Sequence, residues 1–323
     1  DLSRQPLLKT PDLPQGYAAP GDDPLEQALA AQQLSALVGE FEKPRFTHYR
    51  ERICAHSRSG RPGCNRCLDV CSTGAIRPDG DYVKVEPHLC AGCGGCATVC
   101  PSGAMSYTYP RLPDLGTRLK TLLSTYREAG GRDACLAFHD AEEGRAAILG
   151  LARRGKGLPA RVVPVECFHI ASIGIDLLLG AVCYGASQAI VVSNGKEPEG
   201  YLAALREQML FANAILNQLG YVGTHFELVQ AEDSKQLEER LWALQPAQTA
   251  GKTATFNLSP EKRTTLDFEL EHLAQHAPAP QDEIALPSGA TSSNKTAKTP
   301  IVIDISPEGQ VSMNNEVYGA ATD

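Results

Sequence analysis

The sequence lacks both an excess of positive charge and a long uninterrupted apolar run, and each absence argues against a class of protein. It contains 30 Lys and Arg residues against 38 Asp and Glu residues, so its formal net charge is −8. A negative chain repels phosphates and is a poor general nucleic-acid binder. The longest apolar run, residues 170–186, contains Asp176 and is shorter than the ~20 apolar residues of a membrane-spanning helix. We therefore expect no nucleic-acid partner and no membrane span, and we interpret the run as a buried helix.

The sequence also lacks the marks of secretion. Its first residues, DLSR at positions 1–4, provide neither the basic nor the apolar region of a signal peptide, and a chain without an initiator Met is expected to be a processed or excised piece. Eleven cysteines in 323 residues are too few for a scaffold held by disulfides, and eight of them lie between Cys54 and Cys100. Such clustering is typical of metal ligation, and the expected compartment is the reducing cytoplasm.

The spacing of four of these cysteines indicates the kind of metal centre. Residues 90–101 follow the pattern C-x2-C-x2-C-x3-C-P, in which three thiolates hold one [4Fe-4S] cube and the fourth reaches a second cube. Structural zinc sites instead join two separated pairs of cysteines around one ion. The small residues between the cysteines suit a backbone that must approach a cluster closely. The pattern therefore predicts iron–sulfur clusters rather than zinc. Its cysteines are Cys90, Cys93, Cys96 and Cys100.

An imperfect copy of this pattern lies 29 residues upstream, which indicates an internal duplication. The copy retains three of the four cysteines, but Arg61 occupies the position of the first. Because Cys54 lies seven residues earlier, we interpret AHSRSGRPG, residues 55–63, as an inserted loop that lets Cys54 fold back as the missing ligand. His56 is an alternative ligand, since imidazole also occurs in iron–sulfur ligation. The three cysteines of the copy are Cys64, Cys67 and Cys71.

Residues 49–110 resemble a two-cluster bacterial-type ferredoxin. The resemblance implies a compact α+β fold, one-electron transfer, and crossed ligation in which each cube takes one thiolate from the other repeat. Two departures from the pattern are the lengthened loop after Cys54 and the presence of Ser72 where a proline commonly follows the fourth cysteine. We expect Ser72 to affect only the turn that leaves Cys71. The predicted ligands are Cys54, Cys64, Cys67 and Cys100 for the first cluster and Cys90, Cys93, Cys96 and Cys71 for the second.

The chain around the inserted loop is basic, although the whole chain is acidic. Seven basic residues lie between Lys43 and Arg66, against the single acid Glu51. A solvated surface is one interpretation. The other is that the positive charge offsets the anionic clusters and steers an acidic redox partner toward them.

Beyond residue 131, short apolar strands alternate with helices, which predicts an α/β domain with a parallel, flavodoxin-like sheet. The helix at 198–219 carries apolar residues at steps of three and four, a pattern typical of core packing. The expected strands are residues 134–138, 160–167, 189–193 and 225–230.

This α/β segment, residues 131–245, resembles the iron–sulfur family typified by the delta subunit of methyl-viologen-reducing hydrogenase. The resemblance is carried by ARVVPVECFHIASI (160–173), LLLGAVCYGASQAIVVSNGKEPEGY (177–201) and LNQLGYVGTHFELVQAED (216–233). It implies the order of strands and helices described above and, in the family, a [2Fe-2S] site.

The cysteine-rich turns of that family are replaced here by HDAEEG (139–144) and SNGKEPEG (193–200). Only Cys167 matches a family cysteine position, so we expect the [2Fe-2S] site to be lost. The three cysteines of this segment are then expected to be small buried hydrophobes. They are Cys135, Cys167 and Cys183.

An enzymatic role for the α/β domain has weaker support in the sequence. The turn SNGKEPEG is a poor phosphate-binding loop, because its two glycines are separated by a proline. His139 and Asp140 follow a strand, and Cys167 with His169 could form a nucleophile pair, but structural roles explain these residues equally well. We expect an electron-transfer protein that serves a larger oxidoreductase, such as a formate dehydrogenase or hydrogenase-type complex. The alternative is a redox enzyme whose α/β domain reduces a small molecule, and a redox sensor is disfavoured because no DNA-binding motif is present.

The predicted organisation has five parts. An extended lead-in with a short helix (1–48) precedes the two-cluster domain (49–110), and a connecting helix follows (111–130). The α/β domain (131–245) leads into a helix, a flexible linker and a terminal hairpin (246–323). We expect Ser259 and Pro260 to begin the last helix and Glu308–Gly309 to form the turn of the hairpin. The expected apolar face of that helix consists of Leu266, Leu270 and Leu273.

Overall fold

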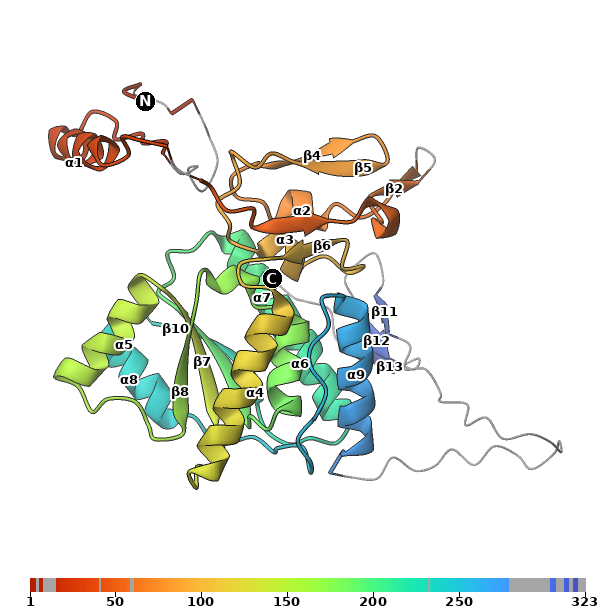
Figure 1. Ribbon diagram of the computed structural model, residues 1–323. Helices are drawn as coiled ribbons and strands as arrows, with labels where there is room; N and C mark the ends of the chain where they lie inside the picture. The colour runs from red at the N-terminus through yellow and green to blue at the C-terminus, as the bar shows by residue number, and fades with distance from the viewer. Residues whose placement is uncertain are drawn as a thin grey trace. The chain divides into compact units, whose positions relative to one another are not determined.

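A computed structural model describes residues 1–3, 6–7, 16–40, 42–58, 61–231 and 233–278, together with three short strands between residues 303 and 318 (Figure 1). The chain divides into two compact units, Asp1–Ala279 and Pro280–Asp323. In the second unit, β11 (Ile303–Ile305), β12 (Val311–Met313) and β13 (Glu316–Tyr318) form an antiparallel sheet. The predicted turn at Glu308–Gly309 and the predicted linker beyond residue 278 lie outside the described residues.

The lead-in contains the expected short helix, α1 (Pro24–Ser35). The side chain of Asp23 caps its first turn by accepting hydrogen bonds from the backbone N–H groups of Leu25 and Glu26. None of its residues is buried, and Leu25 is 66% exposed.

The cysteine-rich segment folds as two short repeats, each with a small helix. The strand before the first repeat, β1 (Thr47–Tyr49), pairs antiparallel with the strand after the second, β6 (Met105–Tyr107). This pairing closes the segment on itself. The elements between them are η1 (Glu51–Ile53), β2 (Ser57–Arg58), β3 (Arg61–Pro62), α2 (Arg66–Asp69), β4 (Ile76–Asp79), β5 (Tyr82–Val85) and α3 (Gly95–Thr98).

The four strands expected in the α/β segment all form, and every pair of them is parallel. In the order β10-β9-β7-β8, the first strand of the segment, β7, lies between the third and the second, so the chain reverses its direction of winding there. All six residues of β9 are buried, as a strand covered on both faces requires. The prediction of a parallel sheet is confirmed. The strands are β7 (Cys135–Asp140), β8 (Val162–Cys167), β9 (Gln188–Ser193) and β10 (Phe226–Gln230).

Helices cover both faces of this sheet (Figure 1). On one face, Ala137, Ile190 and Val192 pack in a core with Leu151 of α5 and Leu237 of α8. On the other face, α6 lies at the centre and contacts α4, α7 and α9. The helices are α4 (Leu112–Glu128), α5 (Glu143–Arg154), α6 (Ile175–Cys183), α7 (Glu199–Gln218), α8 (Ser234–Ala243) and α9 (Lys262–Gln275).

The apolar run at 170–186 is divided between a short 3-10 helix, η2 (Ile170–Ser172), and α6, whose last seven residues are all buried. The expectation of a buried helix is therefore confirmed. In the described part of the chain, no helix has both the length and the apolarity to cross a membrane.

The last helix of the first unit differs from the prediction at its start and on its buried face. It begins at Lys262, because the Ser259 hydroxyl accepts a hydrogen bond from the Glu261 N–H in a turn before the helix. The residues that face the core are Thr265, Glu269 and Leu273, so only one of the three predicted leucines is buried.

Candidate iron–sulfur site

Six of the eight clustered cysteines belong to one small apolar core or pack against it. Cys96 and Cys100 are buried in it beside Val70, Val99 and Met105. The other six thiols are partly exposed, and none of the eleven cysteines forms a disulfide. The cysteines packed against the edge of this core are Cys54, Cys67, Cys71 and Cys93.

One group of thiols surrounds Cys67. Burial, followed by the neighbouring thiols of Cys100, Cys64 and Cys54, raises the pKa of the Cys67 thiol to about 12. Three of these four cysteines belong to the first repeat, whereas Cys100 belongs to the second. The fold therefore brings a thiol of the second repeat to the first repeat.

A second group surrounds Cys93 and Cys96. Burial raises the pKa of the Cys93 thiol, and Cys71 and Cys90 act on it in the same direction. The pKa of Cys96 is raised well above its ordinary value, first by burial and then by Cys93, Cys90, Cys71 and Cys67 in decreasing order. Here Cys71 and Cys67 are the thiols that come from the first repeat, and Cys71 acts more strongly than Cys67.

These thiols are not arranged around a single ion. Among the described residues, no group of three or more His, Cys, Asp or Glu side chains could hold one metal ion. A four-iron cube binds its four thiolates on four different irons, so the thiolates are farther apart than around one zinc.

The inserted loop after Cys54 is a hairpin. β2 and β3 pair antiparallel, and the Cys64 N–H donates to the Ala55 carbonyl at 2.8 Å. This pairing brings the backbone of Cys54 beside that of Cys64. The buried side chain of His56 is hydrogen bonded through Nδ1 to the Cys64 carbonyl at 3.0 Å.

Two glycines allow the backbone of the second cysteine run to lie close to neighbouring residues. Gly92 and Gly94 have φ values of +78° and +83°, in the left-handed region that favours glycine. A Cβ on Gly94 would lie 2.6 Å from the Cβ of Ser172. Backbone N–H groups also point at sulfur atoms: that of Met105 donates to Cys100 Sγ at 3.4 Å, as the shell of an iron–sulfur cluster requires.

The α/β segment holds the second repeat directly. Lys262 of α9 donates to the Thr98 carbonyl at 2.6 Å, and the Thr98 hydroxyl donates to the Ala171 carbonyl at 2.7 Å. Arg66 beside the first repeat forms an ion pair with Glu207 of α7. The cysteine-rich and α/β segments thus belong to one compact unit.

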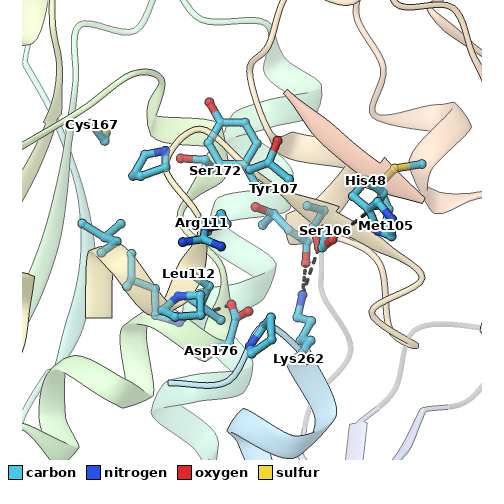
Figure 2. Close-up of a pocket in the computed structure, with 18 of the residues that line it drawn as sticks. His48, Met105, Ser106, Tyr107, Arg111, Leu112, Cys167, Ser172, Asp176 and Lys262 are labelled. Carbon is cyan, nitrogen blue, oxygen red and sulfur yellow. Dashed lines mark hydrogen bonds between the residues drawn. The ribbon is translucent and has the colours of Figure 1, made fainter. Parts of the chain in front are cut away.

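A cavity of about 400 Å³ lies between the two segments (Figure 2). Its wall includes Thr98 and Met105 from the second repeat and Cys167 from the end of β8. Cationic and anionic side chains both border it. They are His48, Arg50, Arg111, Lys262, Glu166 and Asp176.

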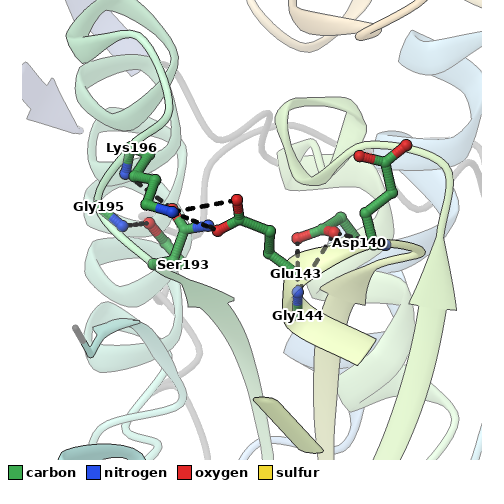
Figure 3. A network of polar contacts seen from close by, with 8 residues as sticks. Asp140, Glu143, Gly144, Ser193, Gly195 and Lys196 are labelled. Carbon is green, nitrogen blue, oxygen red and sulfur yellow. Dashed lines mark hydrogen bonds and ion pairs between the residues drawn. The ribbon is translucent and has the colours of Figure 1, made fainter. Parts of the chain in front are cut away.

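The segments HDAEEG (139–144) and SNGKEPEG (193–200), at the ends of β7 and β9, are tied together by polar side chains (Figure 3). Lys196 Nζ lies 3.2 Å from the Glu143 carboxylate, and Asn194 donates a hydrogen bond to the same carboxylate. On the first loop, the Asp140 carboxylate accepts a hydrogen bond from the Gly144 N–H at 3.1 Å. Ionic and amide contacts therefore join the two loops at the carboxyl ends of β7 and β9.

The remaining three cysteines are buried, as predicted. Cys135 and Cys183 have no exposed surface and Cys167 is 6% exposed. Burial raises the pKa of Cys167 to about 12, and its thiol donates to the His139 carbonyl at 3.2 Å. His169 accepts a hydrogen bond from the Ala171 N–H through Nδ1, which caps η2. A protonated, buried thiol is a poor nucleophile, so the Cys167–His169 hypothesis loses its basis.

Comparison with known proteins agrees with this geometry. Residues 61–104 match the 4Fe-4S dicluster domain family. The chain is 34% identical over 82 residues to a probable iron-sulfur subunit from the Frd operon of Proteus vulgaris, which covers 25% of this chain and 50% of that protein. It is 48% identical over 40 residues to hydrogenase-4 component A of Escherichia coli K12, which covers 12% and 20%. It is 38% identical over 53 residues to an uncharacterized ferredoxin of Methanocaldococcus jannaschii, which covers 16% and 29%.

The chain thus spans half or less of the length of these relatives. The matched segment is a ferredoxin-type iron–sulfur domain, joined to an α/β domain with a parallel four-stranded sheet. The motif that identifies it is the one recognised in the sequence. The contacts of Tyr201, and of Lys262 in α9 beyond the α/β segment, were not foreseen, because no sequence pattern linked either residue to the cysteine repeats.

Proposed function

We propose that this chain is an electron-transfer protein that holds two [4Fe-4S] clusters and relays single electrons to or from a larger oxidoreductase. When bound, each cluster gains or loses one electron at a time. The observation that carries the proposal is the way the thiols divide between two neighbourhoods: Cys100 of the second repeat lies with Cys67, and Cys71 of the first repeat lies with Cys93 and Cys96.

The proposed ligand sets follow this division. The neighbours of Cys67 support a first set of Cys54, Cys64, Cys67 and Cys100. The three thiols that act most strongly on Cys96, with Cys67 only fourth, support a second set of Cys90, Cys93, Cys96 and Cys71. The presence of Cys54 among the neighbours of the Cys67 thiol supports Cys54 over His56 as the remaining ligand.

We propose a formate dehydrogenase or hydrogenase-type complex as the partner. Two of the similar proteins support this role by their names, which describe a hydrogenase component and an iron-sulfur subunit. The basic surface that could meet an acidic partner is smaller than the sequence indicates. Arg50 and Arg66, two of the seven basic residues, form ion pairs with Glu261 and Glu207, whereas Arg45, Arg52 and Arg61 are exposed.

Chemical analysis tests the cofactor. Anaerobically prepared protein is expected to hold about eight irons and about eight sulfides per chain, because each cube contains four of each. Stoichiometric zinc without iron would overturn the proposal. Purification of the native protein tests the partner, because an associated oxidoreductase is expected to copurify with it. If the chain purified alone at physiological salt, the proposed role in a complex would be contradicted.

A redox enzyme is the second candidate, and the cavity between the segments favours it. The cavity borders Thr98 and Met105, which lie beside Cys96 and Cys100, so a small molecule there would be near the second repeat. Extraction of the native protein followed by mass spectrometry distinguishes the two functions. A stoichiometric flavin, nucleotide or organic acid would favour the enzyme, and its absence would favour the relay.

A further inference from the structure

A tyrosine of the α/β segment reaches into the second group of thiols. Tyr201 lies in the first turn of α7, is 1% exposed, and belongs to the same apolar core as Cys96 and Cys100. A Cβ on Gly95 would lie 3.6 Å from its ring, and the ring of His169 packs edge-on against it with centroids 5.3 Å apart. These contacts fix the position of the ring.

The hydroxyl of Tyr201 is hydrogen bonded to the side chains of both Ser72 and Cys93. A phenol has one proton to donate, and a thiolate can only accept. With Cys93 as a thiolate ligand, the Tyr201 hydroxyl therefore donates to sulfur and accepts from the Ser72 hydroxyl. Because both Ser72 and Tyr201 are buried, this chain of hydrogen bonds lies in a low-dielectric environment that strengthens it.

The hydrogen bond to Tyr201 gives Ser72 a role that the sequence did not indicate. It follows Cys71 at the position where Pro101 follows Cys100 in the second repeat. A proline has no hydroxyl and could not make the contact to Tyr201. The departure from the ferredoxin pattern thus coincides with the place where the α/β segment touches the cysteine repeats.

A matching arrangement serves the first group of thiols. The hydroxyl of Tyr49, at the end of β1, is hydrogen bonded to the Cys54 side chain and accepts a hydrogen bond from the Val83 N–H at 3.2 Å. Each group of thiols therefore has one tyrosine whose hydroxyl accepts one hydrogen bond and forms another with a cysteine sulfur. Tyr49 belongs to the ferredoxin segment, whereas Tyr201 belongs to the α/β segment.

We propose that Tyr49 and Tyr201 are positioning residues that each set the reduction potential of one cluster, through a hydrogen bond to Cys54 and Cys93 respectively. The inference rests on the proposed function. A donor to a ligand sulfur stabilises the reduced, more negative state and so raises the potential. The α/β segment then supplies part of the second cluster's site instead of serving only as a scaffold.

The test compares three Tyr→Phe variants of the full chain, each prepared anaerobically and titrated with reductant while EPR follows both clusters. Tyr201→Phe is expected to move one of the two potentials to a more negative value, and Tyr49→Phe is expected to move the other. Tyr107→Phe is the matched control, because its hydroxyl donates to the Gly92 carbonyl at 2.7 Å rather than to a thiol, and it is expected to move neither. Potentials unchanged in both test variants, or moved alike in all three, would overturn the inference.

Two further outcomes have a defined meaning. If the Tyr201→Phe variant loses its iron, the Ser72→Ala variant is titrated in its place. This variant keeps the Tyr201 side chain and removes only the serine hydroxyl that donates to the Tyr201 hydroxyl. It is expected to shift the same cluster in the same direction by a smaller amount, and no shift would refute the role of Tyr201. Wild-type protein without iron would refute the proposed function, whereas about eight irons with unmoved potentials would refute only the tyrosine inference.

Discussion

The ammonium group of Lys262 donates a hydrogen bond to the backbone carbonyl of Thr98 at 2.6 Å, and so joins the first turn of α9 to the end of α3. The same group donates to the Ala97 carbonyl at 3.1 Å. Carbonyls at the end of a helix lack partners within the helix, and a cation suits them. One side chain therefore holds the helix that carries Cys96 against the α/β segment.

Loss of this contact is expected to destabilise the chain. Lys262→Met keeps most of the aliphatic stem but removes the charged donor, and a hydrogen bond to a charged group contributes about 1.5–3 kcal/mol. We expect the midpoint of urea unfolding to fall accordingly. The exposed neighbour Arg263 provides the control, because Arg263→Met should leave the midpoint nearly unchanged. Equal effects of the two substitutions would mean that general charge, rather than this contact, is responsible.

The inserted hairpin predicts which residue completes the first cluster. Cys54→Ala is expected to reduce the iron content from about eight to about four per chain, since one cube loses a ligand and the other keeps its set. His56→Ala is expected to keep about eight irons, because Cys54, rather than His56, is among the neighbours of the Cys67 thiol. Iron analysis with EPR measures both, and the reverse result would assign the ligand to His56.

Crossed ligation makes a separate prediction. Cys100→Ala is expected to abolish the same EPR signal as Cys64→Ala and to leave the signal that Cys90→Ala abolishes. The reason is that Cys100 lies with Cys67 and Cys64, although its neighbours in the sequence lie in the other group. If Cys100→Ala and Cys90→Ala removed the same signal, each repeat would bind its own cluster.

The close approach at Gly94 predicts a strong effect of one added methyl group. Gly94→Ala would impose a left-handed φ of +83° on a residue with a side chain and place its Cβ 2.6 Å from the Cβ of Ser172. We expect a loss of more than about 1 kcal/mol of stability together with reduced iron content. Gly200→Ala, where no atom lies within 4 Å of the new Cβ, is the control and should be tolerated.

Glu269 predicts an unusual dependence of stability on pH. Its side chain is fully buried in α9, and both carboxyl oxygens lack a hydrogen-bond partner among the described residues. Burial raises its pKa well above the ordinary 4.5, and the charge of Asp176 acts in the same direction. The folded state therefore binds this proton more tightly than the unfolded state. The resulting stability is present below the unfolded-state pKa and is lost as the pH rises through the folded-state value.

Glu269→Gln removes this loss, because an amide does not ionise. We expect the variant to exceed wild type in unfolding free energy by roughly 1–3 kcal/mol at about pH 8, and by little at about pH 4. Asp267→Asn, on the exposed side of the same helix, should show no such difference. An advantage of equal size at both pH values would indicate a packing effect instead of ionisation.

The sequence predicted the local features of this molecule well. The strands of the sheet were recognised because apolar runs bounded by turn residues alternate with helical periodicity, and β9 is buried along its whole length as such a run requires. The cysteine spacing predicted the kind of cluster for a similar reason, since the ligands of one cube lie within a few residues of each other.

Features that depend on distant parts of the chain were not predicted. Tyr201 meets Ser72 across 129 residues of sequence, and although Ser72 departs from the ferredoxin pattern, nothing in the sequence paired it with Tyr201. On α9 the leucines at helical spacing suggested the buried face, but the helix is rotated so that Glu269 faces the core. Periodicity cannot foresee a buried carboxyl, because it assumes that the buried side is the apolar side.

The contact between Tyr201 and Ser72 also has a consequence for the order of biosynthesis. All eight clustered cysteines have been synthesised once Cys100 is made, but Tyr201 follows about a hundred residues later, or roughly 5–20 s at ordinary translation rates. During that interval a nascent chain has every thiol but not the hydroxyl that bonds to Cys93. A cluster inserted during that interval would lack the hydrogen bond from Tyr201. We therefore expect stable insertion of the second cluster to follow the folding of the α/β segment.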